Sequence, residues 1–317
     1  MSVLPIELKQ YLKEHYAGKV QFKADLSTIS RWKIGGIAEA IFSPTSSQEL
    51  IDVIKLSSFY NVPTLLIGST SNLLFCDEGI SGLIIEISDS FSECRIENNM
   101  LIAQSGIWAP RLARHAQKSN LSGLEHISGI PGTLGGLVYM NGGSQRKGIG
   151  DRVCYVDTID HDGRLKRYSQ EECLFSYRKS IFQDLDEVIV EVGLKLASNS
   201  NGHFIRQEML EILRSRREKF PLKKPNCGSV FVSDPSMYAE YGPPGKVIED
   251  CGLKGLCIND AQISNDHANF IVNNGKARAK DVISIINQVK ETVKVSTGYS
   301  MKVEVRYVKS DTSVIKL

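Results

Sequence analysis

The chain has 317 residues, with 38 basic and 36 acidic side chains and a formal net charge of +2. Its 42% hydrophobic and 23% charged residues are ordinary for a soluble globular protein of this size and exclude a disordered chain. The nearly balanced charge argues against a nucleic-acid binder, and the longest apolar runs are too short to span a bilayer. Residues 1–10 carry Glu7 and Lys9 in their only apolar stretch, so they do not resemble a signal peptide.

The seven cysteines are an odd number at irregular spacings, and no Cys-x-x-Cys pair is present. This pattern favours buried reduced thiols over a disulfide framework or a zinc site. We therefore expect no metal centre and a reducing, cytoplasmic location.

The first elements predicted along the chain alternate between helix and strand. Ser46, with Glu49 three residues later, has the spacing of a capping box and predicts a helix that ends before Pro63. The next residues, 64–67, predict a short buried strand that runs into Gly68. The pattern is that of a mixed helix and strand protein.

Strands are predicted to dominate the middle of the chain. Pro110 is well placed at the first position of a helix. Residues 155–168 predict a hairpin that turns at Asp162-Gly163. The alternation from Val188 to Leu196 predicts a strand with one buried face.

A polar joint near 198–203 predicts the domain boundary. We expect an N-terminal domain over 1–200, with its core at about 28–197, and a C-terminal domain over 201–317. Further helices are predicted over 205–219 and over a stretch that ends at Gly298. Residues 301–307 alternate again and predict a last strand, on which Glu304 faces away from the core.

The common nucleotide and hydrolase motifs are absent. The sequence has no Gly-x-Gly-x-x-Gly after a strand, no Gly-x4-Gly-Lys-Ser/Thr loop and no Gly-x-Ser-x-Gly elbow. A Rossmann domain is therefore not supported.

Three glycine-rich loops are the alternative nucleotide signal. Each could be a plain tight turn, but successive backbone N–H groups in such loops also form nests that bind phosphate oxygens. Taken together, the three favour a pyrophosphate site. The candidate cofactor residues are Gly35, Gly36, Gly68, Ser69, Thr70, Ser71, Asn72, Gly129, Ile130, Pro131, Gly132, Thr133, Gly135, Gly136 and Asn141.

Eight motifs in order resemble one family. They are Trp32-Lys33-Ile34-Gly35-Gly36, 68–74, 129–136 with Met140-Asn141, Tyr177-Arg178-x-Ser180-x-Phe182, Cys227-Gly228-Ser229-Val230-Phe231, 252–255, Ser264-x-x-His267-Ala268-Asn269-Phe270 and Glu304-Val305-Arg306. Over residues 25 to 308 the chain resembles the UDP-N-acetylenolpyruvoylglucosamine reductase family, also called UDP-N-acetylmuramate dehydrogenase, in the shorter form without the tyrosine loop. It departs from the family at Thr70, where glycine is usual, at 142–148, and at Asn259-Asp260.

The resemblance implies an α+β fold. A p-cresol methylhydroxylase-type FAD-binding domain of two α+β parts would be joined to a smaller α+β substrate-binding domain. FAD and NADPH would be the cofactors, and the enzyme would reduce UDP-N-acetylglucosamine enolpyruvate to UDP-N-acetylmuramate in peptidoglycan precursor synthesis. A small-molecule substrate is thus the expected partner, and the chain is expected to be a monomer.

The resemblance also implies the site residues. Ser229 would donate the proton, and Arg178 and Glu304 would be the other two catalytic positions. Because a carboxylate would repel that of the substrate, we expect Glu304 to be protonated or paired with Arg178 or another cation. The substrate diphosphate needs cations, and the candidates are Arg216, Arg217 and Lys219.

Two alternatives stay open at this point. The chain could be a flavin oxidase of the same superfamily, acting on another substrate. It could also be a catalytically silent flavin- or nucleotide-binding regulator, which the unusual loop at 142–148 would suit. Retention of Arg178, Ser229 and Glu304 argues against the regulator.

Overall fold

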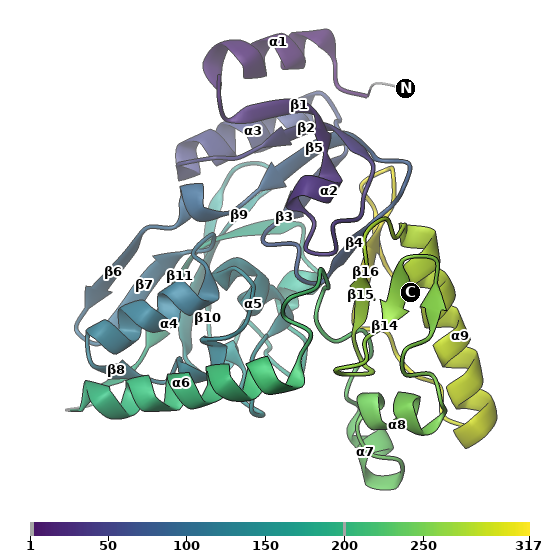
Figure 1. Cartoon of the computed structure of the whole chain (residues 1–317). Helices are drawn as coiled ribbons and strands as arrows, with labels where there is room; N and C mark the ends of the chain where they lie inside the picture. The colour runs from purple at the N-terminus through teal and green to yellow at the C-terminus, as the bar shows by residue number, and fades with distance from the viewer. Residues whose placement is uncertain (1–2, 199–200) are drawn as a thin grey trace.

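The computed structural model describes residues 3–198 and 201–317. The chain builds two α+β parts from residues 6–198 and a third from its C-terminal segment (Figure 1). This arrangement agrees with the predicted fold class. In the described residues, no helix combines the length and apolarity needed to cross a membrane.

The first part is a four-stranded sheet in the order β1-β2-β5-β3. Strands β2, β5 and β3 are parallel, and β1 is antiparallel to β2. Ser46 caps α3 by accepting a hydrogen bond from the Glu49 N–H (3.3 Å), which confirms the predicted start of that helix. The elements are α1 (Ile6–His15), β1 (Val20–Asp25), α2 (Leu26–Ile29), β2 (Ile37–Phe42), α3 (Ser47–Phe59), β3 (Thr64–Ile67) and β5 (Ile80–Glu86).

The second part is an antiparallel sheet in the order β10-β9-β11-β7-β6. The predicted hairpin is confirmed as β9 and β10, and the predicted strand as β11. Its burial is not one-sided as predicted, because the adjacent Ile189 and Val190 are both buried. Two helices, α4 and α5, pack on this sheet (Figure 1). The elements are β6 (Cys94–Glu97), β7 (Met100–Gln104), α4 (Ala109–Lys118), β8 (Leu121–Ser122), α5 (Leu134–Met140), β9 (Val153–Asp160), β10 (Leu165–Ser169), β11 (Glu187–Lys195) and β12 (Ala197–Ser198).

Helix α6 (Gly202–Lys219) lies along the second part, beside α4 (Figure 1). Ile205 and Ile212 are buried, and Met209 packs against the core of the second part. The predicted boundary at 200 assigns this helix to the C-terminal domain. Its packing instead favours a boundary nearer Phe220, where the chain leaves the second part.

The third part has a core formed around α9, which ends at Gly298 in a left-handed conformation (φ 76°), as predicted. The completely buried Trp32 donates from Nε1 to the Ile271 carbonyl (2.7 Å) and so joins the first part to the third. The elements are α7 (Pro235–Glu240), α8 (Pro244–Asp250), β13 (Cys257–Ile258), β14 (Ala261–Ile263), β15 (Ile271–Asn273) and α9 (Ala279–Thr297).

The predicted last strand over 301–307 is wrong in its extent. The structure has β16 (Arg306–Val308), which pairs in parallel with β4 (Leu73–Phe75), and a further strand β17 (Val314–Lys316). Glu304 lies just before β16 and not on it. The reason is that the chain changes partner: Val303 bridges Phe231, and only from Arg306 onward does the backbone pair with β4.

Candidate functional site

The second glycine-rich loop, residues 68–72, joins β3 to β4. In the described part of the chain, its five backbone N–H groups donate to no protein acceptor. A row of unused donors in a tight loop is the arrangement that binds phosphate oxygens. The loop can therefore take an anion without losing any protein hydrogen bond.

Thr70 explains one departure from the family pattern. Its φ of 51° is a left-handed conformation that favours glycine. Its hydroxyl accepts from the Arg31 N–H and donates to the Ile29 carbonyl, both at 3.1 Å. The side chain thus ties the loop to the backbone before Trp32, which compensates for the strain.

The third glycine-rich loop lies directly against the second. A Cβ on Gly68 would be 2.5 Å from Thr133 Oγ1, so glycine is required for the loops to meet. Thr133 caps α5 by accepting from the Gly136 N–H (3.3 Å). A Cβ on Gly132 would meet Ser71 Oγ at 3.5 Å, an ordinary van der Waals contact, so packing does not restrict this position to glycine. The two loops together form one surface for a ligand.

Arg216 lies on this surface, whereas the other two predicted substrate cations do not. A Cβ on Gly129 would be 2.4 Å from Arg216 Cδ, and the guanidinium lies over the Phe220 ring at 4.9 Å. Its Nε is buried with no hydrogen-bond partner, and burial lowers the pKa of the Arg216 guanidinium. Arg217 and Lys219 are exposed. A half-buried guanidinium with an unsatisfied Nε beside the loops suits a phosphate group.

The first glycine-rich loop has a different geometry. A Cβ on Gly36 would be 2.4 Å from the Gly79 nitrogen, and one on Gly35 would be 2.8 Å from Leu26 Cβ. Protein atoms already fill the space beside both glycines. Close packing of the chain is therefore a sufficient reason for them, without a cofactor.

Asn141 is also engaged by the protein. Its side chain accepts from the Gly150 N–H (3.0 Å) and donates to the Ser176 carbonyl (2.8 Å). Its amide therefore holds neighbouring loops together, although it was predicted to bind the cofactor.

Arg178 and Glu304, which are 126 positions apart in sequence, form an ion pair with 2.9 Å between Nε and Oε1. This confirms the expectation that Glu304 pairs with Arg178. Burial raises the pKa of the Glu304 carboxyl, and Arg178 offsets part of that rise. Both side chains are largely buried, so the pair lies in a low-dielectric environment where its charges act strongly.

The second loop and the segment that bears Ser229 both contact Glu304. The Asn72 amide donates to the Glu304 carbonyl (3.2 Å), and the Glu304 N–H donates to the Val230 carbonyl (2.8 Å). The thiol of Cys227 donates to the Thr70 and Leu73 carbonyls. Residues on either side of Ser229 are thus bound to the loop and to Glu304, which brings the half-buried Ser229 into the same region.

Gln183, which contacts this site, was not predicted from the sequence. Its amide nitrogen donates to the Arg178 carbonyl (3.0 Å), and its amide oxygen accepts from Arg306 (2.6 Å). A single glutamine in a loop has no periodicity or spacing that would mark it.

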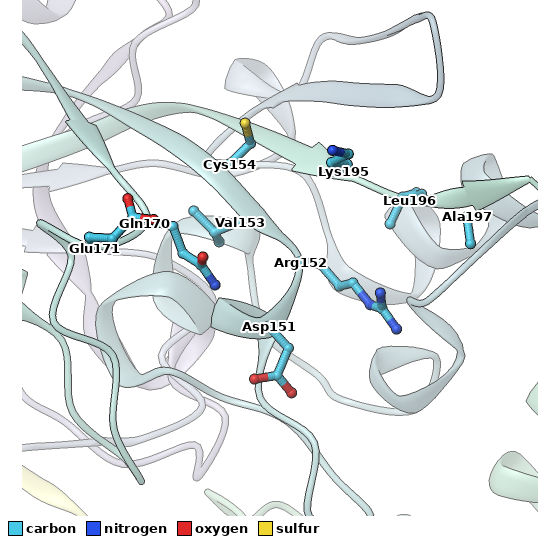
Figure 2. Close-up of a pocket in the computed structure, with 9 residues that line it drawn as sticks. All are labelled: Asp151, Arg152, Val153, Cys154, Gln170, Glu171, Lys195, Leu196 and Ala197. Carbon is cyan, nitrogen blue, oxygen red and sulfur yellow. The ribbon is translucent and has the colours of Figure 1, made fainter.

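A separate surface cavity of about 570 Å³ lies at the ends of β9, β10 and β11 (Figure 2). Asp151, Arg152, Gln170 and Lys195 are among the residues that line it, and none of the predicted site residues does. The cavity is therefore distinct from the region of the glycine-rich loops and Glu304.

Comparisons with known proteins show the family of the chain. Residues 38–169 match the FAD binding domain family, and residues 220–308 match the family described as UDP-N-acetylenolpyruvoylglucosamine reductase, C-terminal domain. UDP-N-acetylenolpyruvoylglucosamine reductase 1 of Corynebacterium glutamicum is 41% identical over 300 residues, which is 95% of this chain and 89% of that protein. The reductase of Heliobacterium modesticaldum is 37% identical over 293 residues, or 92% of each chain.

A solved structure gives the same result. The UDP-N-acetylenolpyruvylglucosamine reductase of Thermus caldophilus superposes with a TM-score of 0.77 at 31% identity, over 90% of this chain and 97% of that one. These proteins are named as reductases, which favours a reductase over the flavin oxidase and the silent regulator.

Proposed function

Because the chain belongs to the UDP-N-acetylenolpyruvoylglucosamine reductase family, we propose that it reduces UDP-N-acetylglucosamine enolpyruvate to UDP-N-acetylmuramate, with Arg178, Ser229 and Glu304 as its catalytic residues. The observation that carries the assignment of these residues is the 2.9 Å ion pair between Arg178 and Glu304, next to the segment that bears Ser229.

The cofactor would be held by backbone and by one cation. The free N–H groups of 68–72 would bind its pyrophosphate together with the third loop. The guanidinium of Arg216, which lies beside Gly129, would supply the positive charge. When bound, FAD supplies to the vinyl group of the substrate the hydride that it takes from NADPH. We leave Gly35, Gly36 and the Asn141 side chain out of the contacts, because the protein already engages them.

Ser229 would complete the reduction with a proton. Once the vinyl carbon has accepted hydride, the carbon next to the carboxylate carries the electron pair and needs a proton. Ser229 Oγ donates it and regains a proton from solvent, so atoms and charge balance. A serine hydroxyl is a weak acid, and it suffices here because the carbanionic centre is a strong base.

Arg178 would stabilise the charge that develops. Its Nε lies 2.9 Å from Glu304 Oε1, and within the described chain its terminal amines donate no hydrogen bond to protein, so they can grip the substrate carboxylate. A guanidinium at contact distance stabilises such a charge by about 4 kcal/mol before desolvation costs. Glu304 fixes the orientation of Arg178 through the ion pair.

The test is the Ser229→Ala variant, followed one half-reaction at a time. NADPH should bleach its flavin at nearly the normal rate, while reoxidation by the enolpyruvyl substrate should collapse. Wild-type reoxidation by substrate is the control for a competent preparation. Normal rates in both half-reactions would remove Ser229 as the proton donor.

The sequence further predicts a monomer in the cytoplasm. The monomeric state and the cytoplasmic location are therefore part of the proposal. Light scattering of the purified protein checks the first: a mass near 35.1 kDa supports it, and a larger mass contradicts it.

A further inference from the structure

Arg178 occupies a strained backbone position. The backbones of Ser176 and Lys179 exchange hydrogen bonds of 3.0 and 3.1 Å, so Tyr177 and Arg178 form a two-residue turn. At φ 56°, Arg178 is in the left-handed region, which is unfavourable for a residue with a Cβ. Such strain persists only where surrounding contacts enforce it.

Gln183 supplies contacts on the C-terminal side of this turn. Its Nε2 donates to the Arg178 carbonyl at 3.0 Å and to the Tyr139 carbonyl, at the end of α5, at 2.9 Å. Both amide hydrogens are therefore used, one on the turn and one on a helix. This anchors the backbone of Arg178 to α5.

The oxygen of the same amide contacts the segment that carries the other half of the ion pair. Gln183 Oε1 accepts from Arg306 Nη2 at 2.6 Å, and Arg306 is two residues beyond Glu304. A single planar amide thus connects the segment that carries Arg178 to the segment that carries Glu304. It provides a fixed link between two groups that belong to separate parts of the fold.

We propose that Gln183 is a positioning residue, which holds Arg178 and Glu304 in register by bonding the Arg178 carbonyl and Arg306 at once. This inference rests on the proposed function of the Arg178–Glu304 pair. Gln183 acts through these residues and is not assigned a contact with the substrate.

The first test is Gln183→Met, which keeps the length of the side chain and removes the hydrogen bonds to Tyr139, Arg178 and Arg306. We expect reoxidation of the flavin by substrate to slow about 10- to 100-fold, since small displacements of catalytic groups cost that much. Flavin reduction by NADPH should stay within about twofold of wild type by the same reasoning. The matched control is Gln170→Met, which removes one bond to the Gly150 carbonyl (3.0 Å) at the cavity of Figure 2.

A pH profile separates positioning from simple loss of structure. Arg178 and Tyr177 interact electrostatically with Glu304. If Arg178 moves away, its positive charge offsets less of the effect of burial, and the pKa of Glu304 rises further. The acid limb of the reoxidation rate should then move to higher pH in Gln183→Met, whereas partial unfolding would lower the rate without moving the limb.

A second variant identifies which link matters. Gln183→Glu keeps an acceptor for Arg306 but loses both donors, so it should be as slow in reoxidation as Gln183→Met. Wild-type reoxidation in either variant, or an unmoved acid limb in Gln183→Met, would overturn the inference. A wild-type protein whose reduced flavin is not reoxidised by the substrate would instead overturn the proposed function.

Discussion

Replacing Arg216 by methionine tests whether the site binds a phosphate of FAD. Methionine keeps an apolar stem against Gly129 and Phe220 and removes the guanidinium. A hydrogen bond to a charged group contributes about 1.5–3 kcal/mol. FAD affinity should therefore fall by about 10- to 150-fold.

The stability of the protein without FAD should change in the opposite direction. Arg216 Nε is buried with no partner, so the guanidinium costs desolvation energy until an anion binds. We expect Arg216→Met without FAD to melt at the same temperature as wild type or higher. The increase in melting temperature on adding FAD should be smaller than in wild type, because ligand stabilisation follows the dissociation constant.

Titration of the apoprotein with FAD, followed by flavin fluorescence, measures the affinity directly. Arg217→Met is the matched control, because Arg217 is the next residue on α6 and is exposed. An unchanged dissociation constant in Arg216→Met would refute the reasoning. If the KM for the sugar nucleotide rose instead, Arg216 would serve the substrate diphosphate, as the sequence first indicated.

Three further changes have defined outcomes. Thr70→Gly relieves the φ of 51° but loses two hydrogen bonds to backbone, so unfolding in urea should show a loss of about 1 kcal/mol, and a gain would contradict the account. Arg178→Lys keeps the charge but loses the planar fork, so stopped-flow reoxidation by substrate should slow about 100-fold with reduction by NADPH unaffected; equal rates would show that bidentate contact is unimportant. Glu304→Gln should remove a pH dependence of stability. Because the pKa of Glu304 is raised, the folded state binds the proton more tightly than the unfolded state, so wild type should lose stability relative to the variant as pH rises above about 4.5. Parallel curves of unfolding free energy against pH for the two proteins would exclude this.

Local sequence signals predicted the local elements well. The cap at Ser46, the turn at Asp162-Gly163 and the end of the last helix at Gly298 depend on a few neighbouring residues. The last strand was predicted too long because its partners are remote. The backbone of Val303 pairs with Phe231 and that of Arg306 with Leu73. Neither pairing can be predicted from the alternation of 301–307.

The contacts among the candidate site residues could not be predicted from the sequence. Glycine occurs both where a side chain would fit and where close packing excludes one. The sequence alone could therefore not separate Gly132, which has room for a Cβ, from Gly36, which packs on Gly79. The three cations 216, 217 and 219 looked equivalent in sequence, and only helix packing distinguishes Arg216. Gln183 could not be predicted as a site residue from the sequence, because its role depends on groups brought together by the fold.

The central claim is that this chain joins a flavin to a proton donor and an Arg178–Glu304 pair that act on an enolpyruvyl ether. The most direct measurement is anaerobic absorbance spectroscopy of the purified, FAD-loaded protein with NADPH and then UDP-N-acetylglucosamine enolpyruvate added in turn. The account predicts that NADPH bleaches the flavin band and that the sugar nucleotide restores it, with one UDP-N-acetylmuramate formed per flavin. A flavin that stays reduced when the sugar nucleotide is added would contradict it.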